Sequence, residues 1–140
     1  MSQRIEDYFN KYHSKEINKG NRKGFYLSGL ILGNLAAEQV KSVRRYSNEF
    51  DTAMFKSIDF RTITPRSLLR VLSGVPEVIS CYVGSQSERE KFEEAGAALY
   101  EYLHINGSGA YELSEDEKFA FTSAWLGAKE EWKKLFGAEE

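Results

Sequence analysis

Nine basic side chains in the first half of the chain have the residue types and spacing to bind phosphate groups. Arginine holds a phosphate through two parallel donors, and lysine holds it as a point charge. Arg66 and Arg70 are four positions apart, so both project from one face of a helix. No base-reading companions accompany them, which favours sequence-independent contact with a nucleic-acid backbone. The candidate phosphate contacts are Lys19, Arg22, Lys23, Lys41, Arg44, Arg45, Arg61, Arg66 and Arg70.

The charge of the chain is divided unevenly along its length. Residues 1–70 carry thirteen Lys/Arg against seven Asp/Glu, a net charge of +6, whereas residues 71–140 carry six against fourteen, a net charge of −8. Such a division predicts a polyanionic partner or self-association through unlike faces. A purely structural explanation stays open for Lys41, Arg44 and Arg45, because cations are stabilising near a helix C-terminus without any partner. The acidic runs at 88–94 and 112–117 lie where helices are expected to begin, and carboxylates are favourable there.

Residues for catalysis or metal binding are sparse. With one cysteine, Cys81, and two histidines, His13 and His104, the chain can form neither an internal disulfide nor a cysteine-based zinc site. No phosphate-binding glycine loop, zinc-protease motif or nucleophile elbow is present. We expect His13 to be a solvated residue at a helix end and Cys81 to be a small buried hydrophobe. The prediction is a non-enzymatic protein without cofactor or metal.

Helical periodicity predicts an all-α protein, a bundle of five or six helices forming one domain over residues 1–140. Helices are expected over residues 2–17, 22–45 and 48–55, and an irregular segment over residues 58–63. Thr64 followed by Pro65 is a helix-start pattern, and Pro76 should kink or break the helix that follows.

Two further helices are expected to begin at capping boxes. The pairs are Ser87 with Glu90 and Ser114 with Glu117, the second helix running to near Gly137.

Three glycines, Gly24, Gly29 and Gly33, lie within the helix predicted over residues 22–45. Each costs about 1 kcal/mol relative to alanine in a helix interior. That cost is tolerable where another helix packs closely against the small residues, so this helix is predicted to be the centre of the bundle. Residues 24–37, fourteen without a charge, are too few for the roughly twenty that a membrane span needs. No secretory signal is visible in residues 1–12, and a soluble, cytoplasmic protein without membrane contact is expected.

Several segments in order resemble one family. Residues 24–39 (GFYLSGLILGNLAAEQ), 58–60 (IDF), 63–69 (ITPRSLL) and 113–127 (LSEDEKFAFTSAWLG) are similar to the C-terminal helical region of the large subunit of type I-B CRISPR Cascade complexes. The resemblance covers about residues 22–136, and Pro76 departs from the continuous helix of the family. In this family that region is also made as a separate small subunit from an internal start codon.

What the resemblance implies is a non-catalytic, RNA-guided antiviral role. Small subunits line the Cascade filament, contact the backbone and large subunits and one another, and help to hold the crRNA–target DNA hybrid and the displaced single-stranded DNA of the R-loop. DNA-binding or RNA-binding through the nine basic residues would fit that role, as would copies of the chain stacked through unlike charges. The alternative is an all-helical protein–protein adaptor that never touches nucleic acid.

Overall fold

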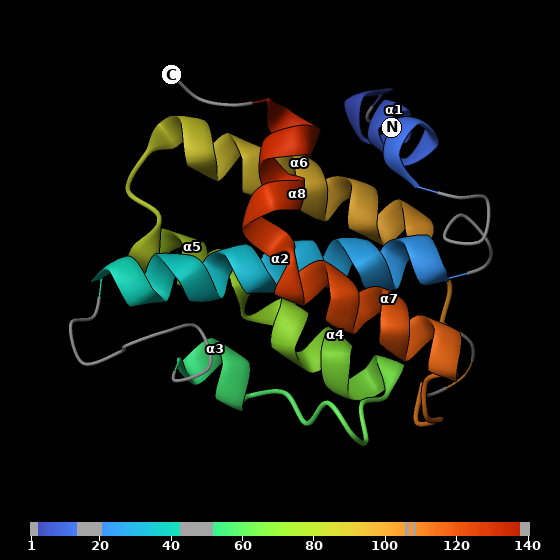
Figure 1. Ribbon diagram of the computed structural model, residues 1–140. Coiled ribbons are helices and arrows are strands. Elements are labelled where there is room, and N and C mark those ends of the chain that lie inside the picture. Colours follow the sequence, from blue (N-terminus) through green and yellow to red (C-terminus); the bar gives the residue numbers. More distant parts are fainter. Residues whose placement is uncertain (1–2, 14–20, 43–51, 106, 108, 138–140) are drawn as a thin grey trace.

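A computed structural model of the chain describes residues 3–13, 21–42, 52–105, 107 and 109–137. Within these ranges the chain forms eight helices and no strand, which confirms the all-α prediction (Figure 1). The helices are α1 (Gln3–Tyr12), α2 (Arg22–Ser42), α3 (Ala53–Lys56), α4 (Pro65–Ser73), α5 (Val75–Tyr82), α6 (Gln86–Tyr102), α7 (Glu115–Leu126) and α8 (Ala128–Phe136). Because one residue separates α4 from α5 and α7 from α8, the eight helices make six consecutive units.

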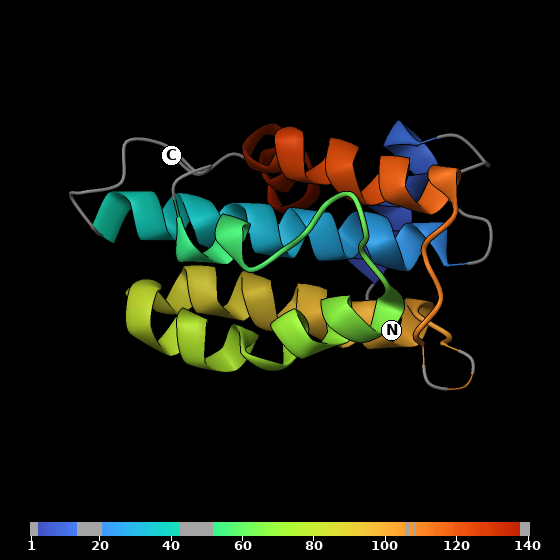
Figure 2. The same cartoon turned by 90° about the horizontal axis from the view of Figure 1, so that it is seen from below.

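Helix α2 is the centre of the molecule, as its sequence predicts. Residues 24–37 are all buried, so the helix has no solvent-facing side over this length. Viewed from below, α2 lies between α7 and α8 on one side and α4, α5 and α6 on the other (Figure 2). Neither α2 nor any other described helix has the length and apolarity required to cross a membrane.

Glycines in α2 allow neighbouring segments to approach its backbone closely. A Cβ atom placed on Gly29 would lie 2.9 Å from Ala124 Cβ, and one on Gly33 would lie 2.7 Å from Ala128 Cβ. Gly24 is crowded in the same way by the side chain of Leu103, which follows α6. The predicted close packing against the small residues of α2 is therefore confirmed, and α7 and the start of α8 are the segments that approach Gly29 and Gly33.

Helix starts and breaks follow the local sequence in most places. The Thr64 hydroxyl accepts a hydrogen bond from Ser67 N (3.0 Å), with Pro65 at the first helical position. The predicted capping box at Ser114 is present, since Ser114 Oγ and Glu117 Oε1 each accept a hydrogen bond from the other's backbone N–H. The break predicted near Pro76 lies at Gly74, between α4 and α5.

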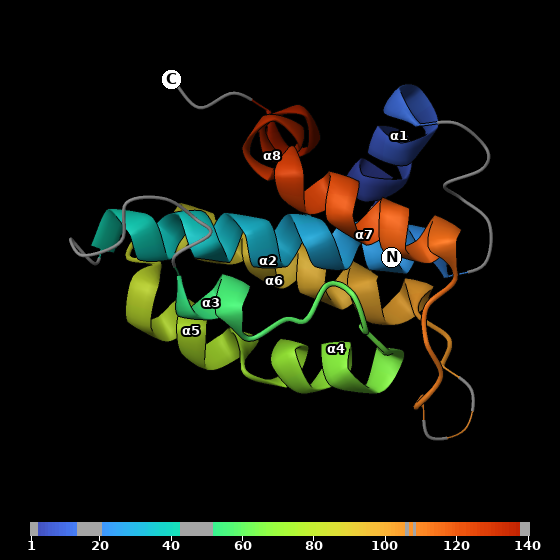
Figure 3. The same ribbon diagram turned by 60° about the horizontal axis from the view of Figure 1, so that its bottom comes forward.

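Other helix boundaries differ from the sequence prediction. Helix α6 is capped by Ser85, whose hydroxyl accepts from Glu88 N, so the predicted cap at Ser87 is wrong. One helix was expected from Ser114 to near Gly137, but Gly127 divides it into α7 and α8 (Figure 3). Ser85 and Ser87 both precede a glutamate by three positions, and the local pattern does not distinguish them.

The N-terminal helices are shorter than predicted. Helix α1 ends at Tyr12 rather than near residue 17, and α3 starts at Ala53, after a cap by Thr52, rather than at residue 48. Helix α2 ends at Ser42, and residues 43–45 of the predicted helix lie outside the described part of the chain. The segment over residues 58–63 is irregular, as predicted.

Candidate nucleic-acid interface

The six predicted phosphate contacts that the structure describes do not form one surface. Lys19, Arg44 and Arg45 lie outside the described residues. Lys23 and Lys41 lie near opposite ends of α2, roughly 27 Å apart at 1.5 Å per residue. The remaining candidates fall into a group at the start of α2 and a group on α4 and the loop before it.

The two basic residues at the start of α2 are held by carboxylates of the protein. Arg22 Nη2 lies 2.7 Å from Asp116 Oδ2 in the first turn of α7. Lys23 Nζ lies 2.9 Å from Glu6 Oε1 of α1, and its side chain is only 12% exposed. These contacts join α2 to α7 and to α1. The structure thus gives both residues a role in helix packing, which the sequence pattern does not reveal.

Arg61, Arg66 and Arg70 form what we call the arginine edge, on α4 and the loop before it. All three are exposed, and Arg61 most of all at 92%. Arg66 and Arg70 have no ion-pair partner among the residues that the structure describes, and the nearest carboxylate to Arg61, that of Asp59, lies at 4.0 Å. Helix α4 presents Arg66 and Arg70 because its opposite face, with Pro65, Leu68 and Leu72, is buried.

The loop before α4 is held by Asp59. Its Oδ1 accepts a hydrogen bond from Arg61 N (3.0 Å) and its Oδ2 accepts one from the Thr62 hydroxyl (2.8 Å). The hydrogen bond from Thr62, followed by that from the Arg61 backbone, lowers the pKa of the Asp59 carboxyl below its usual range. The Arg61 carbonyl in turn accepts from Lys118 Nζ at 3.2 Å. The backbone that carries Arg61 is therefore fixed while its guanidinium extends into solvent.

His13 is not the solvated residue that the sequence suggested. Its side chain is 17% exposed, and Nε2 lies 2.9 Å from the hydroxyl of Tyr8. Tyr8 donates to Glu131 Oε1 at 2.5 Å, so its oxygen accepts from His13 and from the Tyr26 hydroxyl, 3.2 Å away. Position 13 was misjudged because it follows the end of α1 in sequence but packs against α2 and α8 in space.

The pKa values of this cluster reflect burial. Burial lowers the pKa of the His13 imidazole; the nearby Glu131 carboxylate opposes that shift and the Lys134 ammonium adds to it. Burial and the hydrogen bond to Glu131 raise the pKa of Tyr8 far above its ordinary value, and burial raises that of Tyr26 to about 12. Burial alone would raise the pKa of Glu131, but hydrogen bonds from Tyr8 and Lys134 outweigh it and lower that pKa. At neutral pH the imidazole and the two phenols of this buried cluster are therefore uncharged, and the Glu131 carboxylate is ionised.

The other two residues that could take part in chemistry, Cys81 and His104, lie apart from both the arginine edge and the His13 cluster. Cys81 is exposed, so the prediction that it is a buried hydrophobe is wrong. His104 is also exposed, and its backbone exchanges two hydrogen bonds of 2.8 Å with the side chain of Asn21. Neither residue is part of a cluster of catalytic groups.

Sequence reasoning missed a second group of cations. Lys91 of α6 and Lys129 and Lys133 of α8 line one pocket together with Lys41 of α2. Lys91, Lys129 and Lys133 were not recognised as a basic group because they belong to the half of the sequence with a net negative charge. The one local signal is the i, i+4 spacing of Lys129 and Lys133.

Comparisons with protein-family models, with curated proteins and with solved structures found no match to the chain.

Proposed function

We propose that the chain is a non-catalytic, nucleic-acid-binding subunit of an RNA-guided CRISPR effector complex of the Cascade type. The observation that carries the proposal is the arginine edge. Three guanidinium groups lie exposed on one short stretch of chain, and two of them have no ion pair among the described residues. The resemblance of residues 22–136 to the type I-B small subunit names the kind of complex.

The geometry of the arginine edge suits a phosphodiester backbone. Arg66 and Arg70 are one helical turn apart, about 6 Å along the axis of α4, and point to the same side. Each guanidinium can donate two parallel hydrogen bonds to one phosphate. Because arginine side chains without base-reading companions recognise the backbone alone, the proposed binding is independent of base sequence.

The proposal uses fewer residues than the sequence suggested. Arg22 and Lys23 already hold carboxylates of the protein, and nucleic acid would have to displace those contacts. Lys41 is 65% exposed but pairs with Glu38 at 3.2 Å and lies in a different region from α4. The proposed contacts are therefore Arg61, Arg66 and Arg70.

Contacts with other subunits are part of the same proposal. The first turn of α7 presents Glu115, Asp116 and Glu117, and the first two are exposed. This acidic helix start is complementary in charge to a basic surface of a neighbouring subunit, which favours stacking along a filament. Backbone and large subunits of the complex are the other proposed partners.

A binding titration tests the nucleic-acid contact. Fluorescence anisotropy of a labelled single-stranded oligothymidine is measured with wild-type protein and with the double variant R66Q/R70Q, at several salt concentrations. Loss of two phosphate contacts should weaken binding about tenfold or more and reduce the salt slope by about 1.4, since each contact to a single strand contributes about 0.7.

The matched control is K129Q/K133Q, which removes two exposed cations with the same spacing from α8. It should leave the oligothymidine affinity within a small factor of wild type. Equal losses in the two double variants would show that only net charge matters. Wild-type affinity retained by R66Q/R70Q would refute the role of α4.

A protein–protein adaptor is the second candidate, and exposed apolar residues favour it. Phe119 and Leu126 are 72% and 67% exposed and seven positions apart, so they lie on one face of α7. Helix α5 contains no fully buried residue, and a mainly apolar groove of about 420 Å³ separates it from α6. Absence of oligothymidine binding at low salt, with the fold intact, would favour this function over the first.

A further inference from the structure

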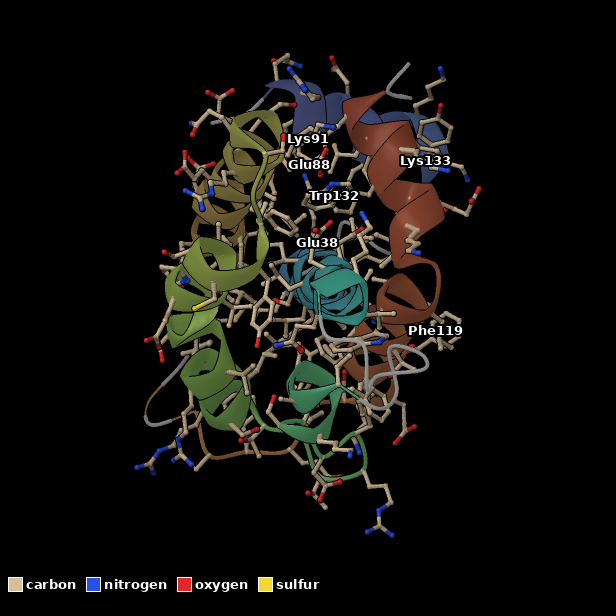
Figure 4. The ribbon with its side chains drawn as sticks, turned by 90° about the vertical axis from the view of Figure 1, so that its left-hand side faces the viewer. Glu38, Glu88, Lys91, Phe119, Trp132 and Lys133 are labelled. Carbon is tan, nitrogen blue, oxygen red and sulfur yellow. The ribbon has the colours of Figure 1, made fainter. Side chains whose placement is uncertain are left out.

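A pocket of about 480 Å³ lies where α2, α6 and α8 meet, and the arginine edge takes no part in it. Figure 4 shows Glu38, Glu88, Lys91, Trp132 and Lys133 grouped around this space, with Phe119 far from them. In each view α8 and α4 lie on opposite sides of α2 (Figures 1 to 4). The pocket is thus separate from the proposed nucleic-acid surface. Its charged lining residues are Glu38, Lys41, Glu88, Lys91, Lys129 and Lys133.

The lining is positively charged. Four lysine ammonium groups against two carboxylates leave a formal charge of +2. Lys41 pairs with Glu38 at 3.2 Å and Lys91 with Glu88 at 2.8 Å, each within its own helix. Lys129 and Lys133 are exposed and make no ion pair within the described part of the chain. The uncompensated charge of the pocket therefore lies on α8.

The break at Gly127 is what places these two lysines. Helix α8 leaves the direction of α7 at this residue (Figure 3), and Trp132 of α8 packs against Phe92 of α6, with the ring centres 4.8 Å apart. Lys129 and Lys133 lie one turn apart on α8, and the pocket contains both. A helix that continued α7 without a break would carry residues 129 and 133 away from Lys91.

The wall of the pocket is buried and fixed. Trp132 is 6% exposed, and its Nε1–H is a buried donor without an acceptor among the described residues. Asn34 lies beside it, with Nδ2 donating to the carbonyls of Leu30 (2.8 Å) and Ala128 (3.1 Å). An ion held against such a wall is less hydrated than on an open surface, so its attraction to the lysines is stronger.

We propose that this pocket binds the phosphoryl groups of a small phosphorylated molecule. Lys129 and Lys133 supply the primary charge, and Lys41 and Lys91 are secondary donors that Glu38 and Glu88 hold in place. A formal charge of +2 matches a phosphoryl dianion, and lysine is a common phosphate ligand. The volume is that of a small-ligand site, whereas a nucleic-acid strand follows an extended charged groove.

Calorimetry at low salt tests the proposal with three probes: inorganic pyrophosphate, ADP and an oligothymidine without terminal phosphates. Wild-type protein should bind pyrophosphate and ADP at one site, with each competing for the other. K129Q/K133Q should weaken both about tenfold or more, since the loss of even one charged contact is worth about a factor of ten. R66Q/R70Q is the matched control and should bind both as wild type does.

A variant that is expected to tighten binding, rather than weaken it, makes the test more specific. Glu38→Gln removes a carboxylate from the pocket lining and should tighten pyrophosphate binding, which a merely destabilised protein would not do. Tighter binding of ADP than of pyrophosphate would identify the ligand as a nucleotide, and equal binding would identify it as a diphosphate alone.

Three results would overturn the proposal: no binding of pyrophosphate or ADP, equal weakening by both double variants, or binding of oligothymidine alone through Lys129 and Lys133. Circular dichroism of each variant shows whether the fold is retained. Because the two double variants exchange roles between this test and the oligothymidine titration, failure of one proposal is distinguishable from failure of the other.

Discussion

Lys23 Nζ lies 4.2 Å from the centre of the Tyr102 ring, so a cation of α2 rests on an aromatic face of α6. The same ammonium group pairs with Glu6 of α1, which also accepts a hydrogen bond from the Tyr102 hydroxyl. Glu6, Lys23 and Tyr102 thus contact one another and connect three helices. The hydrogen bond from Tyr102 is the main reason that the pKa of Glu6 lies below its usual value.

Replacing Lys23 by methionine should destabilise the fold by about 1–2 kcal/mol. The substitution removes the cation–π contact with Tyr102 and the partly buried ion pair with Glu6, but it keeps an apolar side chain of similar length. The free energy of unfolding in urea measures this. Lys56→Met is the control, since Lys56 is exposed on α3, and its effect should stay within about 0.5 kcal/mol. Equal effects of the two substitutions would show that Lys23 has no structural role.

Alanine at Gly29 should destabilise the protein by about 1–3 kcal/mol through overpacking. The new methyl group would meet the Phe121 carbonyl and lie 2.9 Å from Ala124 Cβ, and a backbone carbonyl cannot rotate away as a flexible side chain could. Gly96→Ala is the matched control within α6, where a Cβ meets nothing within 4 Å. That control should stabilise the protein by about 0.5–1 kcal/mol from helix propensity. Opposite signs in thermal unfolding confirm the close approach, and two stabilising substitutions would contradict it.

Acidification should destabilise the fold through His13. Burial places the folded pKa of this imidazole below its unfolded value of 6.5, so the folded state favours the neutral form. The stability that this provides is full above pH 6.5 and is lost as the pH falls through the folded pKa. Urea unfolding at pH 7, 6 and 5 measures the loss. His13→Gln keeps a donor near Tyr8 but cannot titrate, and should make this part of the profile flatter; an unchanged slope would exclude His13 as the source.

Two carboxylates, Glu6 and Glu131, should also make the fold less stable as the pH falls, but at lower pH than His13 does. The pKa values of Glu6 and Glu131 are lowered in the fold, so the stability they contribute is present above about pH 4.5 and is lost as the pH falls through their folded pKa values. The loss of stability below about pH 4.5 should therefore persist in the His13→Gln variant.

Features that depend on neighbouring residues in the chain were predictable from the sequence. The helix start at Thr64–Pro65, the capping box at Ser114 and the small-residue side of α2 each follow from local chemistry. They need no knowledge of which helix lies beside which. The all-α class follows in the same way, from periodicity alone.

Features that depend on distant partners were not predictable. Arg22 looked like a free cation because its partner Asp116 lies 94 positions away, and Lys23 because its partners Glu6 and Tyr102 lie on other helices, 17 and 79 positions away. The pocket between α2, α6 and α8 is lined by lysines at positions 41, 91, 129 and 133, which are too far apart in the sequence to be recognised as one group. His13 was misjudged for the same reason, since its partner Glu131 belongs to α8.

The burial of α2 has a consequence for synthesis of the protein. Gly29 and Phe121, which meet in the fold, are 92 positions apart in the chain. A ribosome therefore releases α2, whose residues 24–37 are all buried in the fold, long before α7, which packs against Gly29, has been made. Arrested chains of increasing length should gain resistance to protease only after α7 has left the exit tunnel. Until then the nascent chain exposes an unprotected apolar helix, the kind of segment that chaperones bind.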